Sequence, residues 1–126
     1  MSDRVSSVNR TVLIVDDDAH VLDISAIIVA NLGYTAVCAS AGQDALKVIE
    51  SDPSVDILLT DIKMPGMHGF ELARRAKAIR TDIRVVYVTG HTSLMPDRTG
   101  ETFGPILRKP FRPHDLAAYL RLVEDC

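Results

Sequence analysis

The sequence is poor in the features that mark secreted, disulfide-bonded and membrane-spanning proteins. Only two cysteines occur in 126 residues, Cys38 and Cys126, which excludes a disulfide framework and a cysteine-based metal site. The opening MSDRVSSVNR lacks the apolar core of a signal peptide, and no apolar run approaches the roughly 20 residues of a membrane helix. We therefore expect a cytoplasmic protein that does not contact a membrane.

Tryptophan is absent, aromatic residues make up 5%, and neither sign of charge dominates. Fourteen Lys and Arg against 17 Asp and Glu leave a net charge of -3, so the chain lacks the basic field that nucleic-acid binding needs. The length suits a single domain. With few aromatic residues, the core must consist of Val, Ile, Leu and Ala, which is typical of a parallel sheet covered by helices.

Five short apolar segments predict β-strands. Three of them are continuous runs rich in β-branched residues, as in strands that are buried on both faces. The other two are weaker. The strong segments are Thr11–Val15, 55–60 and 83–89, and the weak ones are Thr35–Ala39 and 105–108.

Helical spacing of apolar residues follows four of the five predicted strands. The predicted buried positions are Val21, Ile24 and Ile28 in the first helix, Leu72, Ala76 and Ile79 in the third, and Leu116, Leu120 and Val123 in the last. Ser40 and Gln43 have the spacing of a capping box, which predicts that the second helix begins near Gly42. Residues 91–104, interrupted by a proline and a glycine, predict an irregular or shortened fourth helix.

The alternation of strands and helices predicts the fold class. It favours an α/β protein with a (βα)5, doubly wound, parallel five-stranded sheet. We expect the flavodoxin-like strand order 2-1-3-4-5 in one domain over residues 11–126, after a flexible tail over residues 1–10.

Polar residues follow the predicted strands at their carboxyl ends. Asp16 and Asp17 close the first strand, Asp61 the third, Thr89 the fourth and Lys109 the fifth. These ends line one edge of a parallel sheet, and the first and third strands are neighbours in the expected order, so the aspartates should face each other. Carboxylates that lie so close repel one another unless a cation is present. Oxygen ligands without His or Cys favour Mg²⁺.

The same residues have the chemistry for handling a phosphoryl group. Asp61 is a candidate nucleophile that would form an aspartyl phosphate. Thr89 would donate a hydrogen bond, and Lys109 a positive charge, to the phosphoryl oxygens. Together with the metal ion, the lysine would neutralise charge that develops during transfer.

Four motifs occur in order: VLIVDDD, LLTDIKMPGMHG, VYVTG and LRKPF. Together they resemble the receiver domain of bacterial two-component response regulators, in particular stand-alone receivers of the chemotaxis-regulator type, from Thr11 to the C-terminus. The resemblance implies that Asp61 is the phosphoacceptor. It also implies that Asp16, Asp17, Asp61 and the backbone carbonyl of Lys63 hold Mg²⁺.

By the same resemblance, Thr89 and Lys109 contact the phosphoryl oxygens, and the Lys109–Pro110 bond is cis. The implied function is acceptance of a phosphoryl group from a histidine kinase or phosphotransfer protein, followed by changed binding to a downstream protein. Such a chain is a signalling domain rather than a classical enzyme. We expect a monomer or a phosphorylation-dependent dimer.

Two other functions remain open. The first is a protein-binding module that keeps the receiver fold but works without phosphorylation. Ile106 favours this alternative. It stands three positions before Lys109, where relatives often carry an aromatic switch residue. The second is a metal-dependent phosphatase that uses Asp61 on external substrates, which is the weaker alternative because the sequence shows no cap domain.

Four further positions depart from the family pattern or vary within it. His68 and Arg112 stand where relatives often have a helix-capping residue, so both helix starts should lack a favoured cap. Lys63 and His91, two positions beyond Asp61 and Thr89, resemble positions that control the access of hydrolytic water. We expect both to affect the lifetime of the phosphorylated form.

Overall fold

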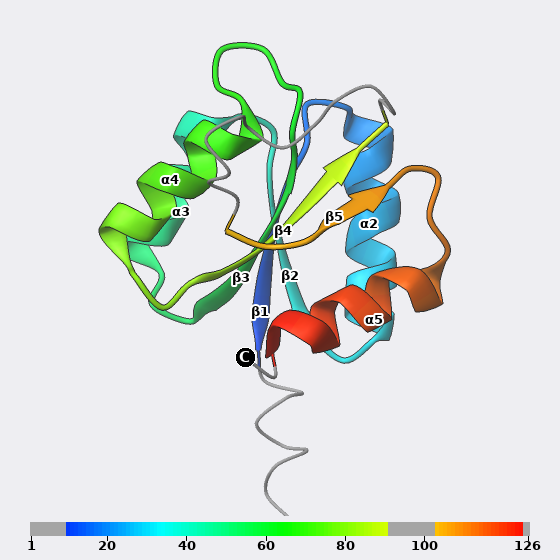
Figure 1. Ribbon diagram of the computed structural model, residues 1–126. Coiled ribbons are helices and arrows are strands. Elements are labelled where there is room, and N and C mark those ends of the chain that lie inside the picture. Colours follow the sequence, from blue (N-terminus) through cyan, green and yellow to red (C-terminus); the bar gives the residue numbers. More distant parts are fainter. Residues whose placement is uncertain (1–9, 91–102, 125–126) are drawn as a thin grey trace, which may run out of the picture.

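The computed structural model describes residues 10–90 and 103–124. Within these ranges it contains five strands and four helices (Figure 1). The strands are β1 (Thr11–Val15), β2 (Thr35–Ala39), β3 (Val55–Asp61), β4 (Arg84–Thr89) and β5 (Ile106–Arg108). The helices are α2 (Ala19–Asn31), α3 (Gly42–Ser51), α4 (Gly69–Ile79) and α5 (Pro113–Glu124).

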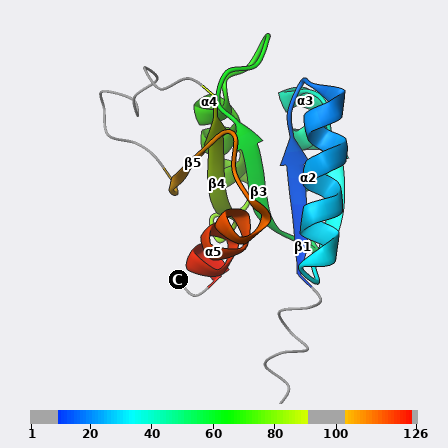
Figure 2. The same ribbon diagram turned by 90° about the vertical axis from the view of Figure 1, so that its right-hand side faces the viewer.

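The strands form one parallel sheet in the order β2-β1-β3-β4-β5. Helices α3 and α4 cover one face, and α2 and α5 cover the other (Figures 1 and 2). The predicted fold class and strand order are therefore confirmed. Both weak segments form strands, and the bounds of β3, β4 and β5 differ from the predicted ones by a single residue.

The packing of the central strands explains why the segments that predict strands most strongly are continuous apolar runs. In β1, Leu13 and Val15 join the core under α3 and α4, whereas Val12 and Ile14 join the core under α2 and α5. Successive side chains of a strand point to opposite faces, so a strand covered on both sides needs apolar residues throughout. The two cores hold the end of β1 rigidly in the sheet.

The predicted buried face of α2 is wrong in part, because Ile28 packs against the core and Ile24 does not. The buried residues are Leu22, Ser25 and Val29, whereas Ile24 is 59% exposed. Apolar residues surround most of this helix, so their spacing does not identify the side that meets the sheet. The helix ends at Asn31, shortly before Gly33, as expected. The stripe in α5 is confirmed in full, and Leu72 and Ala76 of α4 are buried while Ile79 is 39% exposed.

The helix starts show how local capping differs from the sequence pattern. Helix α3 begins at Gly42 as predicted, but its N-cap is Ala41 without a side-chain hydrogen bond, so the capping box of Ser40 and Gln43 is wrong. The helix begins one residue later than that box requires. Asp18 caps α2 by accepting from the amides of His20 and Val21.

The expected lack of a cap at His68 is confirmed, because its side chain makes no capping hydrogen bond. At the start of α5, the amide of Arg112 donates to Oδ2 of Asp115 at 3.0 Å. This bond supplies the half of a capping box that runs back from the third helical position. The Arg112 side chain is not needed for it.

Several expectations concern residues outside the described ranges. The flexible tail over residues 1–10 falls there except for its last residue, and so does the segment 91–102, which contains most of the predicted irregular helix and His91. Among the described residues, no helix has both the length and the apolar character to cross a bilayer.

Candidate functional site

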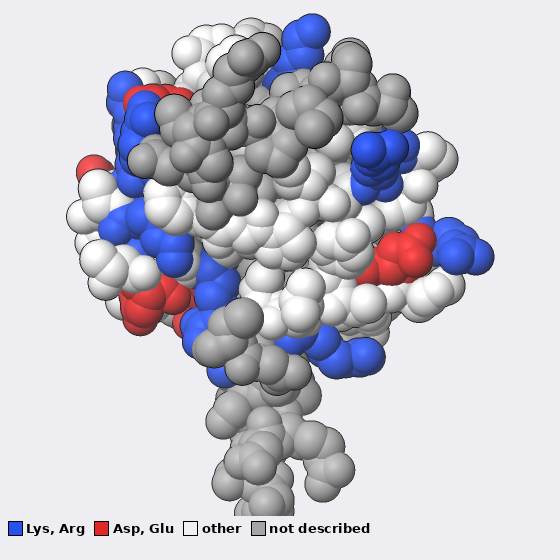
Figure 3. All heavy atoms as spheres, viewed as in Figure 1, with Lys and Arg blue, Asp and Glu red and all other residues white. Residues whose placement is uncertain are grey.

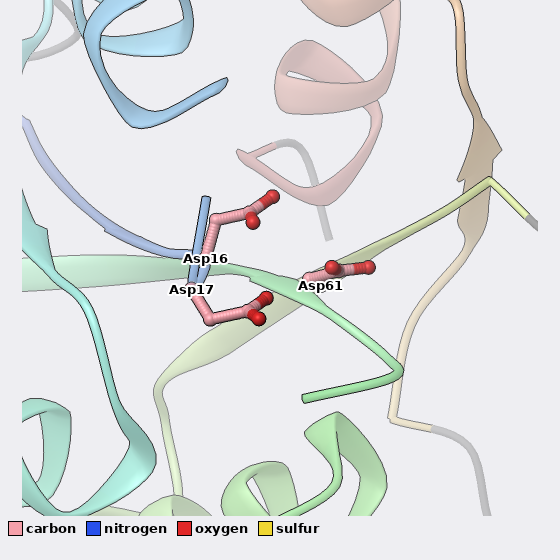
Figure 4. Close-up of side chains that lie close together, drawn as sticks. All are labelled: Asp16, Asp17 and Asp61. Atoms are coloured by element: carbon pink, nitrogen blue, oxygen red, sulfur yellow. The ribbon is translucent and has the colours of Figure 1, made fainter. Parts of the chain in front are cut away.

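Three carboxylates meet at the carboxyl edge of the sheet. Asp16 and Asp17 directly follow β1, and Asp61 is the last residue of the neighbouring strand β3. Each offers one oxygen atom such that all three atoms lie within 4.8 Å of one another (Figure 4). The strand order thus brings together residues that lie far apart in the sequence.

The three carboxylates differ in exposure and in hydrogen bonding. Asp16 is 3% exposed, and its Oδ1 accepts from the amide of Asp18 at 2.9 Å. Asp61 is mostly buried, and its Oδ1 accepts from the amide of Ile62 at 2.9 Å. Asp17 is exposed, so the cluster is open to solvent on that side. Two carboxylates are fixed in place, and the third is accessible.

Lys109 joins two of these carboxylates from the end of β5. Its Nζ lies 3.0 Å from Oδ2 of Asp16 and 3.6 Å from Oδ2 of Asp61. Its backbone amide donates to the carbonyl oxygen of Thr89 at 2.8 Å, and its bond to Pro110 is cis, as the resemblance implied. Thr89 ends β4 at the same edge and is 3% exposed.

Among the residues that the structure describes, one ammonium group faces the three carboxylates, so the electrostatic balance of the cluster is negative. Burial raises the pKa of Asp61 above its ordinary value. The ammonium of Lys109 opposes that shift, whereas the carboxylates of Asp16 and Asp17 add to it. A set of oxygen donors with excess negative charge and one open side fits a small, hard divalent cation.

The loop after Asp61 is held by close packing that was not predicted from the sequence. A Cβ atom at Gly69 would overlap the carbonyl oxygen of Asp61, and the amide of Gly69 donates to the carbonyl oxygen of Ile62 at 2.7 Å. The start of α4 therefore lies directly against the end of β3. A glycine at the first position of a helix, eight residues after the key aspartate, was the available signal.

Within this loop, Met64 and Met67 are 5% and 7% exposed and belong to the core under α3 and α4. Met67 packs against Gly42 at the start of α3. Both methionines therefore hold the loop by packing into the core. Lys63 is exposed in the same loop.

An apolar groove of about 440 Å³ adjoins the cluster between α2 and the chain that follows β5. It is lined by Val21, Ile24, Ser25, Ile28, Gly90, Lys109, Pro110 and Phe111. Lys109 contributes to both the groove and the carboxylate cluster. Because the apolar spacing predicts a buried Ile24, this surface was not predicted from the sequence.

Comparison with known proteins identifies the family. Residues 12–121 match the response regulator receiver domain. The response regulator receiver protein CpdR of Brucella abortus is 33% identical over 109 residues, which cover 85% of this chain and 90% of CpdR. The response regulator SaeR of Staphylococcus epidermidis is also 33% identical, over 82% of this chain but only 45% of SaeR. The chain thus spans less than half the length of SaeR.

Solved structures show the same architecture. A response regulator receiver domain protein from Clostridium thermocellum superposes with a TM-score of 0.85 at 26% identity, covering 92% of this chain and 94% of the other. A CheY-like receiver domain protein from Methanospirillum hungatei gives a TM-score of 0.80 at 31% identity, with the same coverage. Together with the matched residues and the strand order, these similarities show that the chain belongs to the response regulator receiver domain family.

Proposed function

We propose that the chain accepts a phosphoryl group on Asp61 from a phosphohistidine of a histidine kinase or phosphotransfer protein. In this step the phosphorus bond to the donor's imidazole nitrogen breaks as a bond to the Asp61 carboxylate oxygen forms, and the imidazole leaves with the electron pair. The observation that carries the proposal is the position of Asp61 at the sheet edge, beside the carboxylates of Asp16 and Asp17 and within 3.6 Å of the Nζ of Lys109.

The cluster suits a Mg²⁺ ion held by Asp16, Asp17, Asp61 and the backbone carbonyl of Lys63. The carboxylate oxygens of the three aspartates lie within 4.8 Å of one another, and Asp17 leaves one side open. When bound, the ion would supply positive charge that offsets the negative charge of the phosphoryl oxygens. Residues of the chain itself would then hold and orient the phosphoryl group.

Lys109 and Thr89 would recognise the modified aspartate. In the described structure the ammonium of Lys109 binds Asp16 and Asp61. A phosphoryl group on Asp61 would offer it new oxygens within reach, and the hydroxyl of Thr89 would donate to them as well. Because phosphorylation shifts an equilibrium only through contacts that differ between two states, these two residues decide how far the population moves.

The phosphodonor would cover the apolar groove beside Lys109. Lys109 lines the groove and also binds Asp61, so a protein that brings a phosphohistidine to Asp61 must lie over this surface. The exposed Ile24 and Ile27, at 59% and 61%, extend the apolar surface along α2. An amphipathic helical surface on the donor would match it.

The phosphoacceptor assignment is tested by labelling with acetyl phosphate in the presence of Mg²⁺. We expect the wild-type protein to gain the mass of one phosphoryl group, and Asp61→Asn to gain none, because the nucleophilic oxygen is lost. Asp82→Asn, which changes an exposed aspartate elsewhere, should label like wild type. Labelling of Asp61→Asn at the wild-type level would refute the assignment.

The alternative is a protein-binding module that works without phosphorylation. The exposed apolar surface of α2 favours it, since this surface is present in the unmodified chain. Titration with Mg²⁺ and beryllofluoride, a mimic of the phosphoryl group, separates the two functions. The amide chemical shifts of a phosphoacceptor change on joint addition of Mg²⁺ and beryllofluoride, whereas those of a binding module do not.

A further inference from the structure

A buried tyrosine links the strand that ends at Thr89 to the chain that enters β5. Tyr87 of β4 is fully buried, and its ring packs edge-on against Phe70 of α4, with centroids 4.9 Å apart. A buried phenol needs a hydrogen-bond partner. The hydroxyl oxygen of Tyr87 accepts from the backbone amide of Phe103 at 3.2 Å.

Residues 103–105 lie directly against β4 through three separate contacts. Besides the bond from Phe103, the amide of Tyr87 donates to the carbonyl oxygen of Pro105 at 2.9 Å. A Cβ atom at Gly104 would overlap the carbonyl oxygen of Val85, so the two backbones approach closely there. Tyr87 contributes to two of these contacts, one through its backbone and one through its side chain.

The same two strands end in residues of the proposed site. Tyr87 lies two positions before Thr89, so both side chains point to the same face of the sheet. Tyr87 also pairs with Ile106 in the parallel ladder, and Thr89 pairs with Arg108, next to Lys109. A change in the position of β5 relative to β4 would therefore alter the contacts of Thr89 and Lys109. It would also alter the hydrogen bond between Tyr87 and Phe103.

Segment 103–105 also reaches the surface. Phe103 is 38% exposed, and the Nζ of Lys77 lies 6.0 Å from its ring centroid. The centre of the face seen in Figure 3 is uncharged, and basic and acidic side chains lie around it. Movement of the segment would change what a protein partner meets on this face.

We propose that Tyr87 is a positioning residue that couples the state of the Asp61 site to the placement of segment 103–105. The inference rests on the proposed phosphoacceptor function and adds the route by which the modification reaches the surface. When Thr89 and Lys109 turn to the phosphoryl oxygens, β5 shifts along β4, and the hydrogen bond from Phe103 to the Tyr87 hydroxyl differs between the two states. The coupling runs through the hydrogen-bonded ladder between β4 and β5, which has one arrangement before modification and another after it.

The test compares amide chemical shifts before and after addition of Mg²⁺ and beryllofluoride. In the wild-type protein we expect changes at Thr89 and Lys109 and also at Phe103 and Gly104. In Tyr87→Phe the site amides should change as in wild type, while the changes at Phe103 and Gly104 fall by at least half. Acetyl phosphate labelling of Asp61 should be unaffected, since Tyr87 does not contact the site.

Tyr34→Phe is the matched control, because it also removes one phenol hydroxyl, which donates to Oε2 of Glu124 at 2.7 Å, away from β4 and β5. It should keep the wild-type response at all four amides. Full wild-type responses of Phe103 and Gly104 in Tyr87→Phe would overturn the coupling. So would a wild-type protein that responds at Thr89 and Lys109 but not at segment 103–105.

A second measurement covers the case in which Tyr87→Phe does not fold. In wild-type protein labelled with fluorotyrosine, the Tyr87 resonance should shift on addition of Mg²⁺ and beryllofluoride, and that of Tyr34 should not. If the Tyr87 resonance does not shift while the amides of Thr89 and Lys109 respond, the coupling is overturned and the phosphoacceptor function is not. No response at Thr89 and Lys109 overturns the proposed phosphoacceptor function, and this inference with it.

Discussion

At the scale of single residues, the site depends on the balance between one ammonium group and three carboxylates. Asp16 is almost fully buried, and its Oδ2 lies 3.0 Å from the Nζ of Lys109. Removing one partner of such a pair leaves a buried charge without compensation, which costs more than the pair itself contributes. Lys109 therefore stabilises the unmodified fold as well as preparing the site.

We predict that Lys109→Met lowers the free energy of unfolding by about 1–3 kcal/mol in metal-free buffer, less than for a fully buried pair because the lysine is partly exposed. Urea denaturation measures the change. Lys47→Met, which alters an exposed lysine of α3, should leave the stability close to wild type. Equal stability of Lys109→Met and wild type would show that the ion pair does not hold the cluster together.

Residue-scale reasoning from the sequence found the members of this cluster but not their surroundings. Asp16, Asp17, Asp61 and Lys109 each end or directly follow a predicted strand, as does Thr89 at the same edge, so the rule that strand ends share an edge was sufficient. The bond between Tyr87 and Phe103 joins a side chain to a backbone amide. Nearly all residues have a backbone amide, so no residue type in the sequence predicts such a contact.

At the scale of elements, the start of α4 fixes the end of β3. Gly69 allows the helix to approach the carbonyl oxygen of Asp61 more closely than any other residue would permit. The orientation of Asp61 therefore depends on a helix that contributes no side chain to the carboxylate cluster. The sequence shows the glycine but not its contact with Asp61, because the close approach arises from how the two elements pack.

Gly69→Ala should destabilise the protein by about 1–3 kcal/mol, since the added methyl group forces a backbone shift. It should also slow labelling of Asp61 by acetyl phosphate, because the shift displaces the acceptor. Thermal unfolding and the labelling rate measure the two effects. At Gly90 the nearest atom to an added Cβ is Cδ of Lys109 at 3.9 Å, so Gly90→Ala should fold with near wild-type stability. A stable, normally labelled Gly69→Ala would contradict the role of this contact.

The elements themselves were largely predictable, and α2 shows why the prediction was incomplete. Continuous apolar runs identify buried strands because both faces of each strand are covered. In α2, apolar residues occur on more than one side, and packing against the sheet selected Leu22 and Val29 rather than Ile24. Which apolar residue stays exposed is a property of the assembled fold.

At the scale of the whole molecule, the exposed side of α2 and the carboxylate cluster form a continuous surface through Lys109. This continuity separates two kinds of phosphodonor. A small donor such as acetyl phosphate needs only the cluster, whereas a protein donor must also pack against the helix. The two donors should therefore respond differently to a change on α2.

We predict that Ile24→Asp reduces phosphotransfer from a protein phosphodonor by about tenfold, which corresponds to roughly 1.4 kcal/mol of lost contact. Labelling by acetyl phosphate should stay at the wild-type rate, because Ile24 is 59% exposed and does not support the core. Transfer rates from each donor measure the difference. Leu122→Asp, at 56% exposure on α5, is the matched control and should leave both rates unchanged. Equal effects of Ile24→Asp on both donors would place the contact elsewhere.

The most direct test of the phosphoacceptor function is a crystal structure of the protein with Mg²⁺ and beryllofluoride. We predict that beryllofluoride lies on the Asp61 carboxylate, with Lys109 and Thr89 bound to its fluorine atoms and the metal ion among Asp16, Asp17 and Asp61. A fully occupied ion bound at another place, with Asp61 unmodified and Lys109 still paired to Asp16, would contradict the proposed chemistry.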